Sequence, residues 1–329
     1  MTPRARVLVI VAAAAFLAAG GAVALTLITA NDEPGPRSQA KPPPGAPPLV
    51  LDLGVRADPE ARALRRAARL YSRNRRAAAG RIFARYDSVE AQVGSALAAW
   101  PDDTLERLGR LAQDRPGSSV VLLHLGYARV WSGREDEARA AWEAALRAQP
   151  DSAAAQRADD VLHPRFPAGQ PFFVPNFAPP GDLDRLSPPR QLAELERRAR
   201  GRDVRAKLLY GLALQHLGHR ISARREYDAA ARLAPGDPEA RVAAAVGRFD
   251  KSRPAAAFSR LGPLSRRFPR AATVRFHLGL LLFWLAKVQP GSVREGKHQL
   301  RLARSLEPGS RLAGEANRVL AGLEGVETD

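Results

Sequence analysis

The residues able to do chemistry are few and widely spaced. The chain has no cysteine, and its histidines are His124, His163, His216, His219, His277 and His298. Only His216 and His219 are close enough in sequence to share one side of a helix. A metal site needs three or four ligands, and no carboxylate or third histidine stands at a recognisable offset from this pair. We therefore expect no metal site, no disulfide and no cofactor.

Recognisable catalytic motifs are missing as well. The sequence has no P-loop, no G-x-S-x-G nucleophile turn and no H-E-x-x-H zinc motif. The acidic pairs Asp102-Asp103 and Asp159-Asp160 are typical of helix ends or solvated faces rather than of an acid and base couple. We predict no catalytic residue, and an enzyme domain within residues 163–189 is the least favoured alternative. The expected role is binding.

The most apolar part of the chain lies near its start. Residues 7–30 contain no charged side chain over 24 positions, and a bilayer core needs about 20 apolar helical residues. We expect them to form a transmembrane helix that acts as an uncleaved signal anchor in the cell membrane. Residues 1–6 hold Arg4 and Arg6, whereas the first charges after the run are acidic. The positive-inside rule then predicts a cytoplasmic N-terminus and an extracytoplasmic remainder.

A cleaved secretory signal is the alternative to an anchor. Ala22-Val23-Ala24 has the small-x-small pattern of a cleavage site, and cleavage would release a secreted protein. The anchor is favoured because the apolar run continues past this site. Residues 31–58 then form a proline-rich linker. It acts as a semi-rigid spacer that holds the next domain about 50 Å from the membrane, or as a disordered linker.

Helical periodicity runs through residues 59–329. Short helical stretches alternate with Gly, Pro and Asp breaks, and strand-like stretches are scarce. The intervals from Pro116 to Pro150 and from Pro235 to Pro269 are both 34 residues long. A fixed period of this length is typical of stacked helix pairs. We therefore predict an all-α solenoid.

Two segments, residues 119–152 and 204–237, carry the clearest repeat pattern. Small residues, one aromatic residue and a closing proline stand at matched positions, namely Gly126, Ala138, Trp142 and Pro150 in the first and Gly211, Ala223, Tyr227 and Pro235 in the second. Both segments resemble the tetratricopeptide repeat family, in a bacterial membrane-anchored form. The resemblance implies a solenoid in which small residues let two helices approach and the aromatic fills the groove toward the next pair.

Weaker copies extend the array on both sides. They cover residues 60–84, 85–118, 238–271 and 272–310, and a closing helix follows at 311–325. The copy at 272–310 carries about five extra residues. We interpret residues 153–162 and 190–200 as the two helices of one interrupted repeat, split by a Phe/Pro-rich insert at residues 163–189.

The family resemblance implies that the inner face of each first helix binds a peptide of a partner protein. Helical spacing places on this face Tyr127, Val130, Trp131, Leu280, Phe283 and Trp284. These side chains favour an apolar partner segment that contains proline or aromatic residues, with tryptophan and tyrosine as energetic anchors. The alternative is that the same aromatics pack against neighbouring repeats.

The insert combines four phenylalanines with many prolines. The phenylalanines are Phe166, Phe172, Phe173 and Phe177. If exposed, they would form a large apolar patch, so the favoured interpretation is that the insert occupies the inner face as an internal ligand. Two alternatives stay open: the insert projects outward as a recognition element, or it faces the membrane surface.

The chain is strongly basic, with a formal net charge of +17 and 51 basic residues, of which five are lysines. Arginine is spread along nearly the whole chain without interleaved aromatic residues, so no specific nucleic-acid partner is expected. The main expectation is a membrane-anchored extracytoplasmic scaffold for protein partners. The alternative is a polyanion-binding module that docks a cell-envelope polymer or anionic lipid through its arginines.

Overall fold

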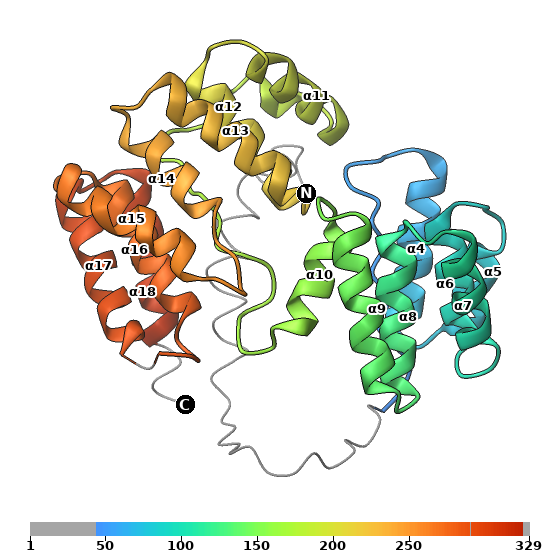
Figure 1. Ribbon diagram of the computed structural model, residues 1–329. Coiled ribbons are helices and arrows are strands. Elements are labelled where there is room, and N and C mark those ends of the chain that lie inside the picture. Colours follow the sequence, from blue (N-terminus) through green and yellow to red (C-terminus); the bar gives the residue numbers. More distant parts are fainter. Residues whose placement is uncertain (1–43, 290, 325–329) are drawn as a thin grey trace. The chain divides into compact units, whose positions relative to one another are not determined.

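The computed structural model describes residues 44–289 and 291–324 (Figure 1). Within these residues all regular structure is helical, which confirms the all-α prediction for this part of the chain. The first helices in chain order are α4 (Pro59–Ser72), α5 (Arg76–Phe83), α6 (Val89–Ala98), α7 (Thr104–Asp114), α8 (Ser119–Trp131), α9 (Glu135–Ala148) and α10 (Ala153–Leu162). They are followed by η3 (Leu183–Arg185), α11 (Pro188–Ala199), α12 (Val204–His216), α13 (Arg220–Leu233), α14 (Pro238–Val246), α15 (Ala255–Arg267), α16 (Ala272–Trp284), α17 (Ser292–Leu306) and α18 (Arg311–Glu324).

The helices form two compact units, each with its own core. The N-terminal unit, described from residue 44 to residue 162, contains α4 to α10. The C-terminal unit, described over 163–289 and 291–324, contains η3 and α11 to α18. Phe83 is fully buried in the first unit, and Tyr227 is fully buried in the second. The repeat region that the sequence suggested as one domain over 59–329 is therefore built from two units.

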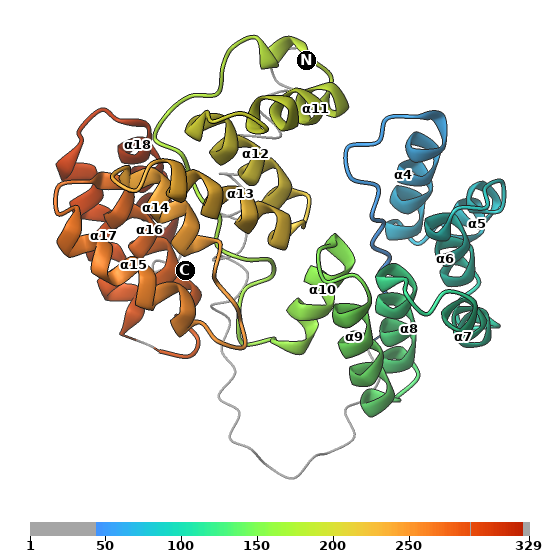
Figure 2. The ribbon, with the colours of Figure 1, turned by 45° about the horizontal axis from the view of Figure 1, so that its top comes forward.

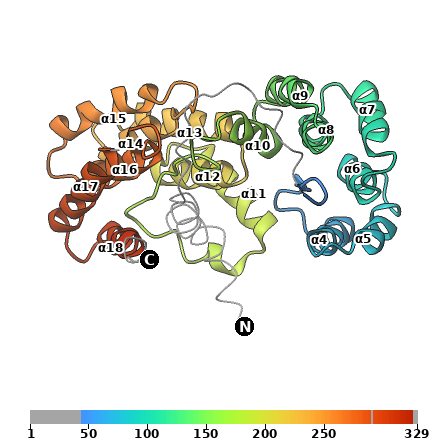
Figure 3. The same cartoon turned by 90° about the horizontal axis from the view of Figure 1, so that it is seen from below.

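Each predicted repeat segment holds two packed helices. The most extensive packing joins α8 to α9, α12 to α13 and α16 to α17. These pairs fall in the segments 119–152, 204–237 and 272–310, so the described chain is an array of helical repeats. Figure 3 shows successive helices of the N-terminal unit side by side, from α4 to α9.

Side-chain caps define where several first helices begin. Asp58 accepts a hydrogen bond from the backbone N–H of Ala61 at 2.9 Å at the start of α4. Asp203 accepts from the N–H of Ala206 at 3.2 Å at the start of α12. Such caps satisfy N–H groups that the first helical turn leaves unpaired.

The glycines of the repeat pattern lie where aromatic rings cross a first helix. A Cβ atom added at Gly126 would come within 2.2 Å of Nε1 of Trp142, and one at Gly211 would come within 2.6 Å of the Tyr227 ring. Trp142 also donates its indole N–H to the carbonyl of Leu123 at 3.2 Å. Only glycine leaves room for these contacts. Ala138 and Ala223 are buried between the same helices, and Pro150 and Pro235 follow the ends of α9 and α13.

The interpretation of α10 and α11 as one interrupted repeat is wrong. Helix α10 packs against α8 and α9 within the N-terminal unit, where Ala154, Ala155 and Ala158 are buried. Helix α11 packs against α12 and η3 within the C-terminal unit. The apolar face of each helix is thus covered by its own unit. In helix order α10 corresponds to α18, since both close their units.

The predicted membrane anchor, residues 7–30, lies outside the described residues. None of the helices between residues 44 and 324 that the structure describes is both long and apolar enough to cross a bilayer. The predicted linker at 31–58 is described from residue 44 onward. There, Leu53 is buried in the core of the N-terminal unit, so the packed domain begins before α4.

Candidate functional site

An extended segment of the insert packs across helices α12, α14 and α16 of the C-terminal unit, each of which is the first helix of a repeat. We call residues 170–177 the C-strap; it is part of the chain that leads into α11 (Figure 2). It has no helical turn, and its hydrogen bonds reach α12, α14, α16 and the N-terminus of α18. We call the surface of these helices that contacts the strap the C-face.

The backbone of the C-strap is held by side chains of the first helices. Gln215 of α12 donates from Nε2 to the carbonyl of Pro171 at 2.9 Å. Three residues later, Val174 donates its N–H to Nε2 of His277 on α16 at 2.8 Å. Tyr227 donates its hydroxyl hydrogen to Oε1 of Gln215 at 2.9 Å, which orients the amide.

Asn176 holds the end of the C-strap through its backbone and both polar side-chain atoms. Its N–H donates to Glu239 of α14 at 2.7 Å, and its Nδ2 donates to Glu307 at 2.6 Å. Its Oδ1 accepts from the N–H of Leu312 at 3.2 Å. Glu307 also accepts from the N–H of Ala272 at 3.2 Å. The strap therefore joins α14, α16, α17 and α18.

Phe173 is the apolar anchor of the C-strap. Its side chain is fully buried. Its ring is stacked on His277, with centroids 5.3 Å apart and an interplanar angle of 16°, and it meets Tyr227 edge-on at 5.8 Å. Burying an aromatic side chain of this size stabilises by about 2 to 3 kcal/mol from apolar area alone.

The other phenylalanines of the insert also contact the C-terminal unit. Phe172 lies against His216, with centroids 4.4 Å apart. Phe166 meets Phe249 edge-on at 6.2 Å, and the guanidinium of Arg205 lies 5.2 Å from the centroid of the Phe177 ring. In the structure the insert is thus packed on its own unit.

The N-terminal unit has a corresponding strap. We call residues 46–53 the N-strap; it is the blue chain that precedes α4 and lies inside the arc of α4 to α9 in Figure 3. Tyr71 of α4 donates its hydroxyl hydrogen to the carbonyl of Pro47 at 2.6 Å. Three residues later, Val50 donates its N–H to Nε2 of His124 on α8 at 3.0 Å. The N-face is the surface of α4 and α8 that makes these contacts.

Both strap-binding histidines are buried and neutral. Nδ1 of His277 lies 2.7 Å from the carbonyl of Thr273, and Nδ1 of His124 lies 2.6 Å from the carbonyl of Val120. A carbonyl only accepts, so Nδ1 carries the proton and Nε2 is free to accept from the strap. Burial lowers the pKa of each imidazole from 6.5 to about 4. The acceptor at Nε2 is therefore present at neutral pH.

The pKa of Glu239 is raised, whereas the pKa values of the two histidines are lowered. Burial raises the pKa of its carboxyl group to about 7, and this outweighs the hydrogen bond from the Asn176 N–H, which lowers it. The C-face thus combines a buried imidazole that resists protonation with a half-buried carboxyl group that favours it.

The six residues predicted for the peptide-binding face lie largely within the cores. Tyr127, Phe283 and Trp284 are buried, whereas Val130, Trp131 and Leu280 are half-buried. Tyr127 meets Trp131 edge-on at 6.4 Å, and Trp284 meets Phe249 edge-on at 5.4 Å. Phe283 packs toward α17, where a Cβ added at Gly296 would come within 2.8 Å of its ring. These aromatics contribute to packing between neighbouring helices.

A second candidate site is a cavity of about 540 Å³ formed by α13, α14 and α15, which we call the arginine pocket. Its lining includes Arg232, Arg241, Arg248, Arg260 and Arg267. Arg248 is paired with Asp228 at 2.9 Å, and Arg267 donates to the carbonyl of Pro235 at 3.3 Å. Asp228 is the single acidic residue of the lining.

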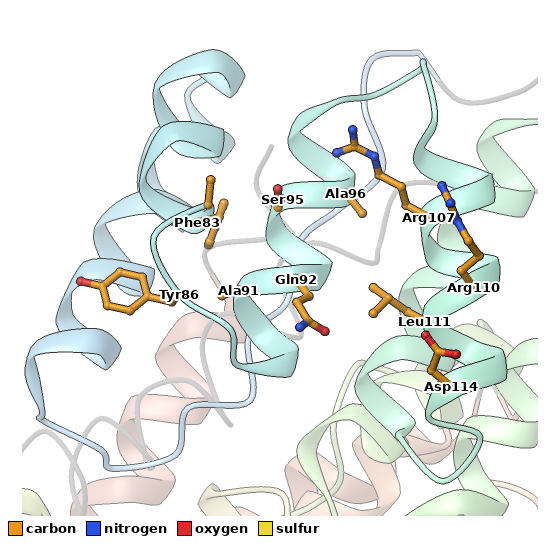
Figure 4. A pocket seen from close by; sticks show the side chains of 11 residues that line it. Phe83, Tyr86, Ala91, Gln92, Ser95, Ala96, Arg107, Arg110, Leu111 and Asp114 are labelled. Carbon is orange, nitrogen blue, oxygen red and sulfur yellow. The ribbon is translucent and has the colours of Figure 1, made fainter.

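The corresponding helices of the N-terminal unit, α5, α6 and α7, form a smaller pocket of about 310 Å³ (Figure 4). Figure 4 shows Arg107 and Arg110 of α7 on one side and Gln92 and Ser95 of α6 on the other. Both arginines have acidic partners on their own helix or its cap, Asp103 at 3.4 Å and Glu106 at 3.2 Å. The concentration of arginine is thus particular to the pocket of the C-terminal unit.

Sequence reasoning missed the groups that hold the straps. The sequence pattern offers His124 and His277 only as possible metal ligands, and in the described residues no three His, Asp or Glu side chains cluster as ligands. The missed groups also include Tyr71, Gln215, Asn176, Glu239 and Glu307. A partial signal was present, because His-Leu-Gly lies within the first helices of two repeats, at 124–126 and 277–279. The same tripeptide also occurs at 216–218, at the end of α12.

No protein-family model matches the chain, and no curated protein matches it. Among solved structures, the chain is similar to the C-terminal part of a TPR repeat-containing protein from Cytophaga hutchinsonii, with 14% identity, 79% of this chain and 99% of that chain covered, and a TM-score of 0.28. It is also similar to the APC/C hetero-tetramer Cut9-Hcn1, with 15% identity, 79% of this chain and 55% of that chain covered, and a TM-score of 0.26. Superpositions this weak carry no functional inference.

Proposed function

We propose that this protein is a scaffold that binds extended segments of partner proteins across the first helices of its repeats. The observation that carries the proposal is the C-strap, an extended segment that the C-face holds through four backbone hydrogen bonds and one buried aromatic ring. Contacts to backbone atoms fix an extended chain without requiring a particular side chain at each position, and a pocket for one side chain adds specificity. A face built in this way suits linear segments.

The straps then act as internal competitors for the same faces. A segment tethered next to its site has an effective concentration on the order of millimolar, so it outcompetes a weak external ligand. A partner must therefore displace a strap or bind a chain whose strap has been released. Partner binding is regulated by strap release in this scheme.

A display experiment tests the scaffold function directly. A library of random 14-residue segments is selected against the full chain and against a variant with a weakened C-strap, Phe173→Ala combined with Asn176→Ala. We expect extended segments with proline and large apolar residues to be enriched on the variant and much less on the parent chain. The matched control is Phe166→Ala, which alters the insert outside the C-strap.

Two outcomes would contradict the scaffold proposal. The first is no enrichment on the strap variant while circular dichroism shows an intact helical fold. The second is enrichment of acidic segments whose binding is lost at about 0.5 M salt. Charge interactions are screened within about 4 Å at this salt concentration, whereas apolar binding should persist.

The proposal includes attachment to the membrane through residues 7–30, with the helical units outside the cytoplasm. Its support is the uncharged run of 24 residues and the arginines that precede it. A protein recovered from the membrane fraction with an intact N-terminus is the expected result. A mature N-terminus near Leu25 would instead establish secretion after signal cleavage.

The arginine pocket supports a second candidate function, the binding of a phosphate-bearing envelope polymer or anionic lipid. Five arginines around about 540 Å³ with one acidic residue favour an anionic ligand. We expect Arg241→Gln combined with Arg260→Gln to weaken binding of inorganic polyphosphate and of phosphatidylglycerol vesicles at low salt. Arg107→Gln combined with Arg110→Gln, which removes the same two charges from the smaller pocket, is the matched control. Equal binding by both variants would assign the attraction to net charge alone.

A further inference from the structure

The two straps share two backbone contacts with the first helices of their repeats. In each strap a proline carbonyl accepts a hydrogen bond from a side chain of the first helix, Tyr71 of α4 or Gln215 of α12. Three residues after that proline, a valine N–H donates to a buried histidine two first helices further along, His124 of α8 or His277 of α16. Helix order and strap spacing therefore agree between the units.

The surroundings of the two histidines also agree. At the start of α8, the N–H of Ser119 donates to the side chain of Gln149 at 3.2 Å, as the N–H of Ala272 at the start of α16 donates to Glu307 at 3.2 Å. Each histidine lies five residues after that N–H and two residues before the glycine of its repeat. The sites are equivalent in structure rather than similar by chance in one contact.

The two strap sequences share the features that these contacts require. They read Pro47-Pro48-Leu49-Val50 and Pro171-Phe172-Phe173-Val174. The first position offers a carbonyl, the third places a large apolar side chain against the core, and the fourth must carry an N–H. Proline at the first position favours an extended backbone in the residue before it and fixes its own φ.

From these equivalences we infer that each unit carries the same kind of recognition site, which binds an extended Pro-x-Φ-Val segment, where Φ is a large apolar residue. At the N-face, such a segment of a partner protein replaces the N-strap. This inference rests on the proposed scaffold function and names its ligand class. The fourth position excludes proline, because proline has no N–H to donate to the histidine.

The N-face is the site open to exchange because its strap is held less tightly. Leu49 and Val50 are half-buried, whereas Phe173 is fully buried and Val174 nearly so. The C-strap is also fixed at Asn176 by Glu239, Glu307 and Leu312. In addition, the C-strap is joined at both ends to helices of the described chain, α10 before it and α11 after it.

Fluorescence anisotropy with two labelled peptides tests the inference on the full chain. One peptide has the sequence of residues 44–56 and the other that of residues 168–180. Each is also made with N-methylvaline in place of the valine of the motif, Val50 or Val174. The receiving chain carries Val50→Pro, which removes the N–H that the N-strap donates to His124. A second receiving chain, Leu49→Ala combined with Val50→Ala, weakens the strap without introducing proline.

We expect both peptides to bind either variant at least about tenfold more tightly than they bind the parent chain, because the tethered strap no longer competes. N-methylation should weaken binding about tenfold or more, since it leaves His124 without a donor. Adding His124→Leu to either variant should abolish binding to the N-face.

The results that would overturn the inference are distinct from those that would overturn the scaffold function. Binding of only the peptide from the unit's own strap, or equal binding of the N-methylated peptides, refutes a shared Pro-x-Φ-Val site. If displayed segments of another pattern are still enriched, the scaffold function stands without this motif. If neither strap peptide nor any displayed segment binds, the scaffold function itself fails.

Discussion

The backbone N–H of Val174 donates a hydrogen bond to Nε2 of His277 at 2.8 Å, in the interior of the C-terminal unit. The proton on Nδ1 is directed to the carbonyl of Thr273, so the imidazole is fixed in the tautomer that accepts at Nε2. An extended backbone usually pairs its N–H groups with a neighbouring β-strand. Here the acceptor is a side chain of helix α16, so the strap is held without a β-sheet.

Replacing His277 should show the value of this acceptor. His277→Leu leaves the Val174 N–H buried without a partner, and we expect it to lower the free energy of unfolding of the C-terminal unit by about 1 to 3 kcal/mol. His277→Gln keeps an acceptor near the position of Nε2 and should cost less. Urea denaturation followed by circular dichroism measures both.

The exposed His298 is the control for the loss of an imidazole as such, and His298→Leu should change stability by less than about 0.5 kcal/mol. Equal losses in the Gln and Leu variants of His277 would mean that ring packing against Phe173, rather than the acceptor, provides the stabilisation.

Phe173 and Phe172 are adjacent and should respond very differently to truncation. Phe173→Ala removes a fully buried ring and should cost about 3 to 5 kcal/mol, whereas Phe172 is half-buried and its truncation should cost roughly half as much. Limited proteolysis after Arg165 and Arg185 should become faster in the Phe173 variant, because both sites flank the C-strap. Unchanged cleavage together with full stability would show that the ring does not hold the strap.

The helix pairs could be predicted because their signals are local. Closing prolines recur at an interval of 34 residues in two places. The glycine and the aromatic residue that meet, Gly126 with Trp142 and Gly211 with Tyr227, lie within one stretch of that length. Periodicity therefore located the segments in which the helix pairs lie. The division into two units was not predicted, because it depends on which helices cover the apolar faces of α10 and α11.

The strap-binding groups could not be found from local pattern. Val50 meets His124 over 74 residues and Val174 meets His277 over 103 residues, and an extended strap has no periodicity of its own. Aromatic residues at helical spacing instead predict a binding face at Trp131 and Trp284. Their rings pack against Tyr127 and Phe249, which is the alternative that the sequence left open.

Glycine substitutions within one unit provide a test of the close helix packing. Gly126→Ala places a Cβ atom against Trp142 and should destabilise the N-terminal unit by about 1 to 3 kcal/mol through overpacking. Gly109→Ala on α7 meets no atom within 4 Å and should stabilise the unit by about 0.5 to 1 kcal/mol, because alanine is the better helix former. Thermal unfolding distinguishes the two. Loss of stability in both variants would contradict the packing argument.

Acid should destabilise the N-terminal unit through His124. Its pKa is about 4 when folded and 6.5 in an exposed chain, so between these values the unfolded state binds more protons. Stability is therefore complete above about pH 6.5 and falls as the pH decreases toward 4, by about 3 kcal/mol at most. His124→Gln should remove this dependence while keeping an acceptor for Val50.

The C-terminal unit should lose less stability in acid than its two histidines of lowered pKa, His216 and His277, would cause alone, because Glu239 opposes them. The pKa of Glu239 is raised from 4.5 to about 7, so the folded state binds more protons in this range and its stability falls as the pH rises through it. Glu239→Gln removes this opposing contribution and should expose the acid sensitivity due to His216 and His277. Hydrogen exchange with mass spectrometry at about pH 7 and pH 5 reads the two units separately. A Gln variant at Glu239 with the same pH profile as the parent chain would show that the carboxyl group is not protonated in the folded unit.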